Sequence, residues 1–479
     1  MIKSSLRGRQ LVVLGFGTIG PTVLPLIFEM FLVSPQEVTI IAEKVNFESY
    51  FVSLGVRVIQ KRLTRDNMSE TVLSYVSERT FVLNLSVGIS CLDIIEVCQE
   101  IGALYLDTSN EDWALYGNSG TSSTYRRRLK TLKSLEAIRN KKGVPTALLY
   151  HGANPGLVTH FAKAALRSIA QQEAWYVDGL EYRLGWGELC RKLDVLTVHV
   201  SERDTQRVNR RLANNLLMNT WSVDGFLEEI LECCNFAWGT HESKLHELTK
   251  EIFTTEYGIV AELACSATSV PVRSWLPEVG VYEGYLVPHP ETFSIAEELS
   301  VRSLDGRLLY QPTVQFVYSP CEMIRQNLAK FSGGIGGQGF AKEIALDEIR
   351  SGADDLGVTI FRQGREEIYW FGSCLDIDEA RELSKFGNAT SLQVAAGVLS
   401  GMEWTVAHPE LGVCEPEQVD YRRALEVAAP FLGRWGGIAG FWSSSSEDQA
   451  LSWTFEELCA SGALFHTVEK AGSRAAAAT

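Results

Sequence analysis

A chain of 479 residues is too long for one hydrophobic core and predicts two or three domains. With 46% hydrophobic and 22% charged residues, the composition is that of an ordinary globular protein. The formal net charge of −15 argues against a nucleic-acid partner, which requires a basic face, and is compatible with a cationic substrate. The ten cysteines include no C-x-x-C pair and the eight histidines are dispersed, so we expect no metal and reduced, cytoplasmic thiols.

The first predicted element is a buried parallel strand, Leu11–Leu14, followed by a glycine-rich turn and a helix. The glycines have the G-x-G-x-x-G spacing of a dinucleotide site. The first permits the turn, the second lets the backbone approach a pyrophosphate, and the third brings helix and strand together. We therefore predict that the cofactor phosphates lie on the helix N-terminus, at Gly15, Gly17, Thr18, Ile19 and Gly20.

Three other interpretations of this stretch compete. Arg7 and Arg9 before an apolar run resemble a signal peptide, but a small-residue cleavage site is missing. Residues 11–33 are long enough to cross a bilayer, but two prolines and three glycines interrupt them, so we expect no membrane partner. The third interpretation is a strand and turn that bind no ligand. It stays open because a single G-x-G-x-x-G is a weak motif.

Strands alternate with short helices as far as residue 108, which predicts a Rossmann-type doubly wound parallel sheet. We expect strands at 37–41, 55–60, 81–85 and 103–106, and helices at 68–77 and 92–99. Because such sheets bind ligands at the carboxyl ends of their strands, we predict cofactor contacts from Glu43, Asn84, Leu85, Ser86, Asp107 and Thr108. A carboxylate at Glu43 would hold the adenosine ribose and favour NAD over NADP.

The domain boundary is predicted near residue 152. A basic helix at 126–140 is interpreted as a solvated face rather than a nucleic-acid patch. A sixth strand at 144–150 runs into an Asn-Pro-Gly turn, and a helix follows from Leu157. We expect Ala153, Asn154 and Pro155 to lie over the nicotinamide end of the cofactor, where the chain leaves the dinucleotide-binding domain, residues 1–152.

Residues 153–388 predict a second, α+β domain with a mixed or antiparallel sheet, which we expect to bind substrate and form the dimer. Strands are expected at 195–201, 284–286, 293–295, 314–318, 358–361 and 367–371, and helices at 257–265 and 321–329. A second G-x-G-x-x-G, at 334–339, follows a helix instead of a strand and is interpreted as a surface loop. Helices within 389–479 are expected to return to the first domain, beginning with an apolar-faced helix over 388–408.

Acidic and aromatic side chains gather in loops predicted at the domain junction. They are Glu111, Glu202, Asp204, Asp224, Glu229, Glu291, Trp113, Trp221 and His289. Carboxylates and an aromatic face can together hold a protonated amine. Beside a dinucleotide, they predict a site for a cationic substrate.

Eight motifs between residues 10 and 432 resemble the bacterial homospermidine synthase family, of the saccharopine dehydrogenase-like superfamily. They are GFGTIG (15–20), NLSV (84–87), ALYLDT (103–108), GANPG (152–156), ERDTQR (202–207), NTWSVDGF (219–226), VRSW (272–275) and NATSLQV (388–394). The resemblance implies a homodimer with tightly held NAD that joins two putrescines, or putrescine and spermidine, and releases ammonia. It implies that NAD takes a hydride from one amine-bearing carbon and that the same NADH reduces the new imine, with no net redox change.

By this resemblance, Trp221 stabilises the iminium through a cation–π contact and Asn154 positions the nicotinamide and the reacting carbon. Ammonium groups are anchored and protons shuttled by Glu202, Glu229 and Glu291, with Glu111 and His289 nearby. Gly88 departs from the family pattern, which has an acidic residue there, and this leaves the substrate range open. Ala42 stands at the expected ribose carboxylate with Glu43 one step on, which leaves the cofactor preference open.

Two other functions stay open. A saccharopine or carboxynorspermidine-type dehydrogenase with net redox would need an arginine fork for its substrate carboxylate, and Arg203, Arg207 and Arg273 are available. A non-enzymatic dinucleotide sensor would keep the glycine turn and bind the cofactor without turnover.

Overall fold

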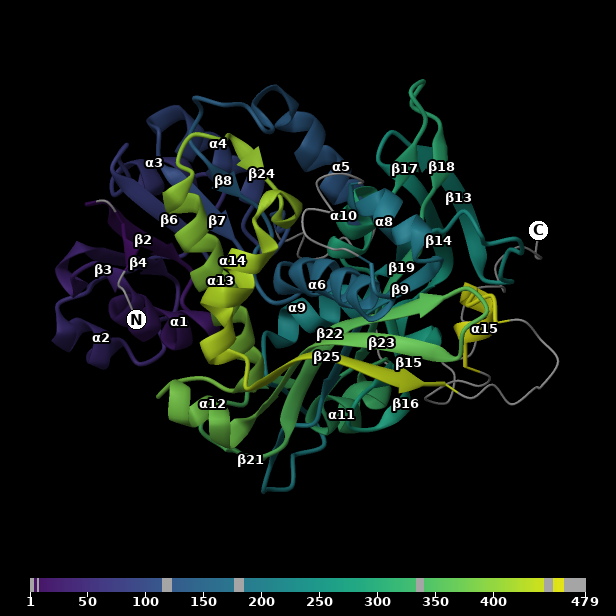
Figure 1. The fold of residues 1–479 in the computed structure, drawn as a ribbon. Helices are drawn as coiled ribbons and strands as arrows, with labels where there is room; N and C mark the ends of the chain where they lie inside the picture. Colours follow the sequence, from purple (N-terminus) through teal and green to yellow (C-terminus); the bar gives the residue numbers. More distant parts are fainter. Residues whose placement is uncertain are drawn as a thin grey trace, which may run out of the picture.

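The computed structural model describes residues 4–6, 8–113, 123–175, 185–332, 340–442 and 451–460. A parallel sheet at the N-terminal end of the chain and a larger mixed sheet form the two halves of the molecule (Figure 1). The second glycine motif, at 334–339, lies outside the described residues.

Seven described strands form the first sheet, in the order β5–β4–β2–β6–β7–β8–β24, and all are parallel. The order reverses at β2 and β6, which is the switch point where doubly wound sheets bind dinucleotides. The bounds are β2 (Gln10–Leu14), β4 (Val38–Ala42), β5 (Arg57–Gln60), β6 (Thr80–Asn84), β7 (Leu104–Asp107), β8 (Ala147–Leu148) and β24 (Val413–Cys414). The predicted Rossmann-type sheet is confirmed, although β8 is shorter than the strand expected at 144–150.

Helices connect and cover these strands. They are α1 (Ile19–Met30), α2 (Glu48–Leu54), α3 (Met68–Leu73), α4 (Cys91–Ile101) and α5 (Thr124–Ser134), with short 3-10 turns at Pro35–Glu37 and Glu136–Ile138. A small pair of strands, β1 (Ser4–Ser5) and β3 (Phe31–Leu32), lies beside them.

Ten described strands form the second sheet, in which β9 and β19 are parallel and the other pairings are antiparallel. The main path is β13–β14–β12–β19–β9–β22–β23–β25, with β16 on β19 and β15 on β16. The bounds are β9 (Val195–Asp204), β12 (Cys233–Ala237), β13 (Thr249–Thr255), β14 (Gly258–Ser266), β15 (Pro271–Leu276), β16 (Gly280–Val287), β19 (Thr313–Ser319), β22 (Ala353–Arg362), β23 (Glu367–Asp376) and β25 (Arg434–Phe441). The predicted mixed sheet is confirmed.

The remaining elements surround this sheet. The helices are α6 (Leu157–Gln172), α8 (Trp186–Lys192), α9 (Val223–Leu231), α10 (Glu291–Glu298), α11 (Glu322–Ser332), α12 (Ile377–Leu383), α13 (Ala389–Ala407), α14 (Tyr421–Ala428) and α15 (Phe455–Leu458). The short strand pairs are β10 (Arg207–Val208) with β21 (Ile349–Ser351), β11 (Leu216–Asn219) with β20 (Ala341–Ile344), and β17 (Val301–Arg302) with β18 (Leu308–Tyr310).

Two predicted elements of the second half are wrong. Residues 257–265, expected as a helix, form β14, because β12 and β13 satisfy the backbone on both sides and a short apolar run fits either period. Residues 293–295, expected as a strand, lie in α10. There Pro290 precedes the helix with the φ that its first turn needs, and Glu291 places a carboxylate at the positive end of the dipole.

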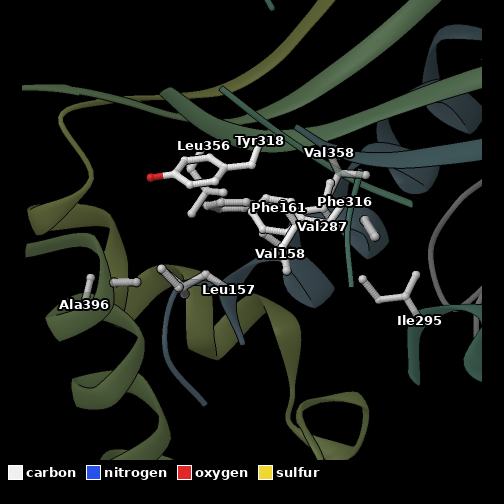
Figure 2. Packing of buried hydrophobic residues seen from close by; sticks show 14 of the residues in the cluster. Leu157, Val158, Phe161, Val287, Ile295, Phe316, Tyr318, Leu356, Val358 and Ala396 are labelled. Carbon is white, nitrogen blue, oxygen red and sulfur yellow. The ribbon is translucent and has the colours of Figure 1, made fainter. Parts of the chain in front are cut away.

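Helix α6 forms the core of the second half. Val158 and Phe161 from α6 lie beside the buried strand residues Val287 and Phe316, whereas Leu157 lies toward Ala396 of α13 (Figure 2). The turn before α6 requires a glycine, because Gly156 has φ 126° and a Cβ there would overlap the Gly152 carbonyl oxygen. This packing fixes the preceding turn, which carries Asn154, over the strands of the larger sheet.

Helix α13 lies between the two sheets and packs on α1 and β7, as expected for a returning helix (Figure 1). Helix α14 packs on α13 and α6. Between these helices and the C-terminus, residues 434–441 form β25 on the edge of the larger sheet, paired with β23. No described helix has the length and apolar character needed to cross a membrane.

Candidate active site

The glycine turn after β2 has the shape of a phosphate cradle. Gly15 has φ 78°, and a Cβ there would lie 2.6 Å from the Ser86 Cα, so the neighbouring strand end excludes a side chain. A Cβ on Gly20 would lie 2.5 Å from the Phe16 ring, which sets the close packing of helix on strand. A Cβ on Gly17 would meet nothing within 4 Å, so this glycine faces open space. The three positions therefore fit the roles expected for binding a pyrophosphate.

The first turn of α1 suits an anion. Its N-cap, Thr18, is buried and makes no side-chain capping bond, and the turn holds no acidic residue. The first amides of the helix are consequently left to an incoming ligand, with the dipole favouring negative charge. Ile19 is partly exposed at the start of the helix.

The polar side chains predicted to contact the cofactor from β6 and β7 bond mainly to one another. The Ser86 hydroxyl donates to Asn84 Oδ1 across 2.5 Å, Asn84 Nδ2 donates to the Tyr105 hydroxyl across 2.9 Å, and that hydroxyl donates to Asp107 Oδ2 across 2.8 Å. Burial raises the pKa of Asp107 to about 7. Hydrogen bonds from the Tyr150 amide and the Tyr105 hydroxyl lower this pKa but do not cancel the effect of burial. This chain of bonds locks the strand ends in register beneath the glycine turn.

Other predicted cofactor residues lie at the same edge of the sheet. Leu85 and Thr108 are partly exposed, and Thr108 lies against Gly152. Ala42 is the last residue of β4 and is 6% exposed, whereas the Glu43 side chain is 59% exposed and pairs with Arg62 at 3.8 Å. Ala42 thus occupies the strand end, and the carboxylate next to that end is the exposed one of Glu43.

The turn at the domain boundary reaches the larger sheet through one hydrogen bond. Asn154 Nδ2 donates to Glu202 Oε2 across 2.7 Å, and the turn is closed by the Gly152 amide on the Pro155 carbonyl at 2.8 Å. Ala153 is buried beneath it. Burial and the nearby Asp204 raise the pKa of Glu202 to about 8, although the Asn154 amide opposes the shift. The structure thus brings two predicted residues together in one partly buried pair.

Glu202 is one of three buried carboxylates that share a face. Glu202 and Asp204 lie two residues apart on β9, and Asp354 on β22 stands opposite Asp204 in the register. Thr220 and Gln206 donate to Asp204, whose pKa burial raises to about 6, while Thr390 donates to Asp354. No salt bridge in the described part of the chain involves these three carboxylates, and the buried Asp354 Oδ1 has no hydrogen-bond partner there. A row of carboxyl groups without a salt-bridge partner suits a cationic ligand.

His289 lies between two of the predicted glutamates. Its Nδ1 bonds to Glu291 Oε2, and its Nε2 lies 3.5 Å from Glu229 Oε1. Burial alone would lower the pKa of His289, but the charges of Glu291 and Glu229 outweigh it and hold the pKa well above its usual value. The two carboxylates therefore favour the protonated form of His289, which contacts both of them.

Aromatic rings connect this histidine with Trp221. The half-buried Trp221 donates its Nε1 to the Tyr318 hydroxyl across 3.1 Å. Tyr318 stands opposite Glu202 in the β19–β9 register and stacks on Phe316, with 5.6 Å between ring centroids. Phe316 in turn contacts the His289 ring at 5.1 Å (Tyr318 and Phe316 in Figure 2). The indole, the carboxylate row and the imidazolium thus belong to one site on β9 and β19.

Three of the acidic and aromatic residues predicted at the junction have hydrogen-bond or ion-pair partners outside the carboxylate row. Asp224 pairs with Lys342, and Trp113 donates its Nε1 to Asp93 Oδ2 across 2.6 Å. Glu111 lies at the end of the first sheet, where it accepts the Gly88 amide across 3.0 Å. Burial raises the pKa of Glu111 to about 7, with Glu228 adding to the shift.

Sequence reasoning missed Asp354 and Tyr318 as site residues. Asp354 begins an apolar strand, where an acidic residue resembles a solvated strand end, and Tyr318 resembles an ordinary core aromatic. The signal that could have singled out Asp354 is the pair Asp354–Asp355 ahead of an otherwise apolar run. Among the described residues, the histidines, cysteines and carboxylates form no group of three or more placed to hold a metal.

Two family models match the chain: the saccharopine dehydrogenase NADP binding domain over residues 11–147, and the saccharopine dehydrogenase C-terminal domain over residues 152–440. The protein therefore belongs to the saccharopine dehydrogenase-like class. Its doubly wound sheet carries the glycine cradle, and its mixed sheet carries the acidic and aromatic site.

Similar proteins narrow this class. The chain is 36% identical over 438 residues to the homospermidine synthase of Blastochloris viridis, covering 90% of this chain and 91% of that protein. It is 32% identical over 450 residues to the homospermidine synthase of Mesorhizobium japonicum, covering 90% of each. The crystal structure of the homospermidine synthase from Legionella pneumophila in complex with NAD matches with a TM-score of 0.86 and 33% identity, over 96% of this chain and 99% of that one. The chain therefore belongs to the homospermidine synthase family.

Proposed function

We propose that the protein is a homospermidine synthase, an NAD-dependent aminobutyl transferase that joins two putrescines, or putrescine and spermidine, and releases ammonia. The observation that carries the proposal is the buried row of Glu202, Asp204 and Asp354 beside the Trp221 indole, joined to the cofactor half through Asn154. The row consists of three carboxyl groups without a salt-bridge partner among the described residues, and the two positive charges of a diamine would stabilise their ionised forms.

Each side chain has a role that follows from its surroundings. Glu202 and its neighbours bind the ammonium groups, and a bound cation stabilises their ionised forms. The exposed part of the Trp221 indole faces the positive charge that develops on the reacting carbon and nitrogen. The His289 imidazolium holds Glu229 and Glu291 in place as proton acceptors. When bound, NAD supplies a hydride acceptor and then a hydride donor, so the reaction has no net redox change.

We propose NAD as the cofactor. The glycine turn accommodates a pyrophosphate, and the Glu43 carboxylate can accept bonds from both ribose hydroxyls but repels a 2'-phosphate. The matching N-terminal family model is described as NADP binding, and the relative from Legionella pneumophila was solved with NAD. The Glu43 carboxylate supports NAD rather than NADP as the cofactor of this chain.

We also propose a cytoplasmic homodimer. All ten cysteines are free thiols, which suits a reducing compartment. Strand β25 is the edge of the larger sheet and exposes Trp435 (39%), Ile438 (41%) and Phe441 (74%). A second copy of β25 could pair antiparallel with this edge, with Trp435 and Phe441 on one face of the joined sheet and Ile438 on the other. Sedimentation of F441E tests this: a monomeric variant supports the surface, and an unchanged mass contradicts it.

One specific contact weighs against the alternative of a net dehydrogenase. Arg273, one of the three arginines available for a substrate carboxylate, donates to the Glu457 carbonyl across 2.6 Å and lies over the Trp442 ring at 5.8 Å. It is engaged with the C-terminal segment instead of the carboxylate row.

Purified protein incubated with NAD and putrescine distinguishes the three functions when polyamine mass and NADH absorbance are followed together. Homospermidine and ammonia without lasting NADH support the synthase. Stoichiometric NADH indicates a dehydrogenase, and bound NAD without either product indicates a sensor.

A further inference from the structure

The NATSLQV motif, residues 388–394, contains none of the residues to which the proposed reaction assigns a role. It forms the N-terminus of α13, between the two halves of the molecule. Asn388 is its N-cap: Asn388 Oδ1 accepts the Ser391 amide across 2.9 Å, and the Ser391 hydroxyl accepts the Asn388 amide across 2.8 Å. Asn388 is 2% exposed, so its remaining polar atoms must find partners in the protein.

The other end of the Asn388 side chain binds the segment that carries Trp221. Asn388 Nδ2 donates to the Thr220 carbonyl across 2.6 Å and to the Ala345 carbonyl across 3.1 Å. Thr220 directly precedes Trp221, and its hydroxyl donates to Asp204 across 2.5 Å. The backbone on the N-terminal side of the indole is therefore pinned from two directions, by α13 and by the carboxylate row.

The same helix end also contacts the cofactor half. The Thr22 hydroxyl, in the first turns of α1, lies 3.1 Å from both the Ser391 hydroxyl and the Thr18 carbonyl oxygen and shares its proton between them. Gly387 approaches so closely that a Cβ there would overlap Thr22 Oγ1. Because α1 opens with the glycine turn, the chain of contacts runs from the cofactor cradle through Thr22, Ser391 and Asn388 to Thr220.

We propose that Asn388 is a positioning residue that sets the Trp221 indole relative to α1, and through α1 relative to the nicotinamide. The proposal rests on the function proposed above, because it assumes that Trp221 acts on the substrate. Asparagine meets the requirement because its side chain offers one acceptor for the helix cap and two donors for the carbonyls of Thr220 and Ala345. Serine and aspartate also cap helices well, but neither supplies these two donors.

The N388S variant therefore separates the two uses of the side chain. It keeps a capping oxygen on α13 and removes the amide donors. D420A is the matched control, because Asp420 caps α14 by accepting the amides of Arg422 and Arg423, and no hydrogen bond links it to the Trp221 segment in the described structure. N388D, which keeps the size of the side chain, serves in place of N388S if the latter does not fold.

The first readout is fluorine NMR of NAD-loaded protein labelled with 5-fluorotryptophan, with the Trp221 resonance assigned by its absence in W221F. We expect N388S to shift or broaden the Trp221 resonance, and D420A to leave it unchanged. An unmoved Trp221 resonance in N388S overturns the proposal. This measurement does not require turnover, so it stays decisive even if the protein makes no homospermidine.

The second readout is a double-mutant cycle on the rate of homospermidine formation. N388S should lower kcat about tenfold in the wild-type background while NAD content is kept, as expected for losing hydrogen bonds that hold one residue. In the W221F background the same change should cost less than about twofold, since residues that act through one another are not additive. Equal losses in both backgrounds would show a general structural effect and contradict the proposal.

Discussion

Asn154 donates its side-chain amide to Glu202 across 2.7 Å, and this hydrogen bond joins the turn that leaves the dinucleotide-binding sheet to the carboxylate row of the larger sheet. The two residues are 48 positions apart in the chain. The bond opposes the burial and the Asp204 charge that raise the pKa of Glu202 to about 8. Its removal should therefore be visible in the pH dependence of the reaction.

In N154A, the pH midpoint of kcat/KM should rise by about 1 unit relative to wild type, because a hydrogen bond to a carboxylate contributes about 1.5 kcal/mol or more to its ionised form. The titration of the substrate amines is common to both profiles and cancels in the comparison. N67A, which changes an asparagine on the surface of the first domain, is the control and should keep the wild-type midpoint. A midpoint that does not move in N154A would show that Glu202 does not control binding.

E202Q should stabilise the cofactor-free protein at alkaline pH. The folded state holds the Glu202 proton more tightly than the unfolded state, so wild-type stability falls as pH rises from 4.5, the ordinary pKa of a glutamate, to about 8. We expect the Tm of E202Q to exceed that of wild type by about 2 °C or more at pH 9 and to match it near pH 4, as measured by calorimetry. E96Q, on an exposed glutamate of α4, should show no such pH dependence. A Tm difference independent of pH would refute the assignment.

W221A should lower turnover about thirtyfold, because a desolvated cation–π contact contributes about 2 kcal/mol. The turnover of W221F should lie between that of wild type and that of W221A, since phenylalanine keeps a weaker aromatic face. NAD bound per chain, measured after denaturation, should stay at the wild-type level in both variants. Parallel losses of NAD and activity would mean that the indole supports the fold rather than the reaction.

G17V should retain its fold and lose its cofactor. A Cβ on Gly17 meets nothing within 4 Å, so the larger side chain fills only the space needed by the pyrophosphate. We expect the Tm of the NAD-free variant to match that of NAD-free wild type, while NAD no longer copurifies. Normal NAD content in the purified variant would place the phosphates elsewhere.

E43A should change the cofactor preference. Removing this carboxylate costs its hydrogen bonds to the ribose and raises the Kd of NAD about tenfold. It also removes repulsion of a 2'-phosphate and frees the neighbouring Arg62, so NADP binding should improve. Isothermal titration of the cofactor-free protein with each dinucleotide measures both effects, and an unchanged ratio of the two Kd values would exclude Glu43 from the ribose site.

The first half of the molecule was predictable because its signals are local. A buried strand, three spaced glycines and the start of a helix occupy residues 10–20, and each requirement involves neighbours in the sequence. The motif that contains Trp221 was visible for the same reason, since its residues are consecutive.

The second half depended on partners that are distant in the sequence. Residues 258–266 are a strand because β12 and β13 lie on either side, and an apolar run of this length does not specify that choice. Residues 434–441 complete the larger sheet because β23 offers an open edge.

The sequence by itself determined the dinucleotide-binding sheet, the glycine cradle and the kind of residues in the site. Only the tertiary structure decided which carboxylates meet, that Asp354 stands opposite Asp204, and that Asn388 reaches the Trp221 segment. The physical reason is that periodicity and turn chemistry act between neighbouring residues, whereas burial, charge interaction and hydrogen bonding act between whatever side chains the fold brings together.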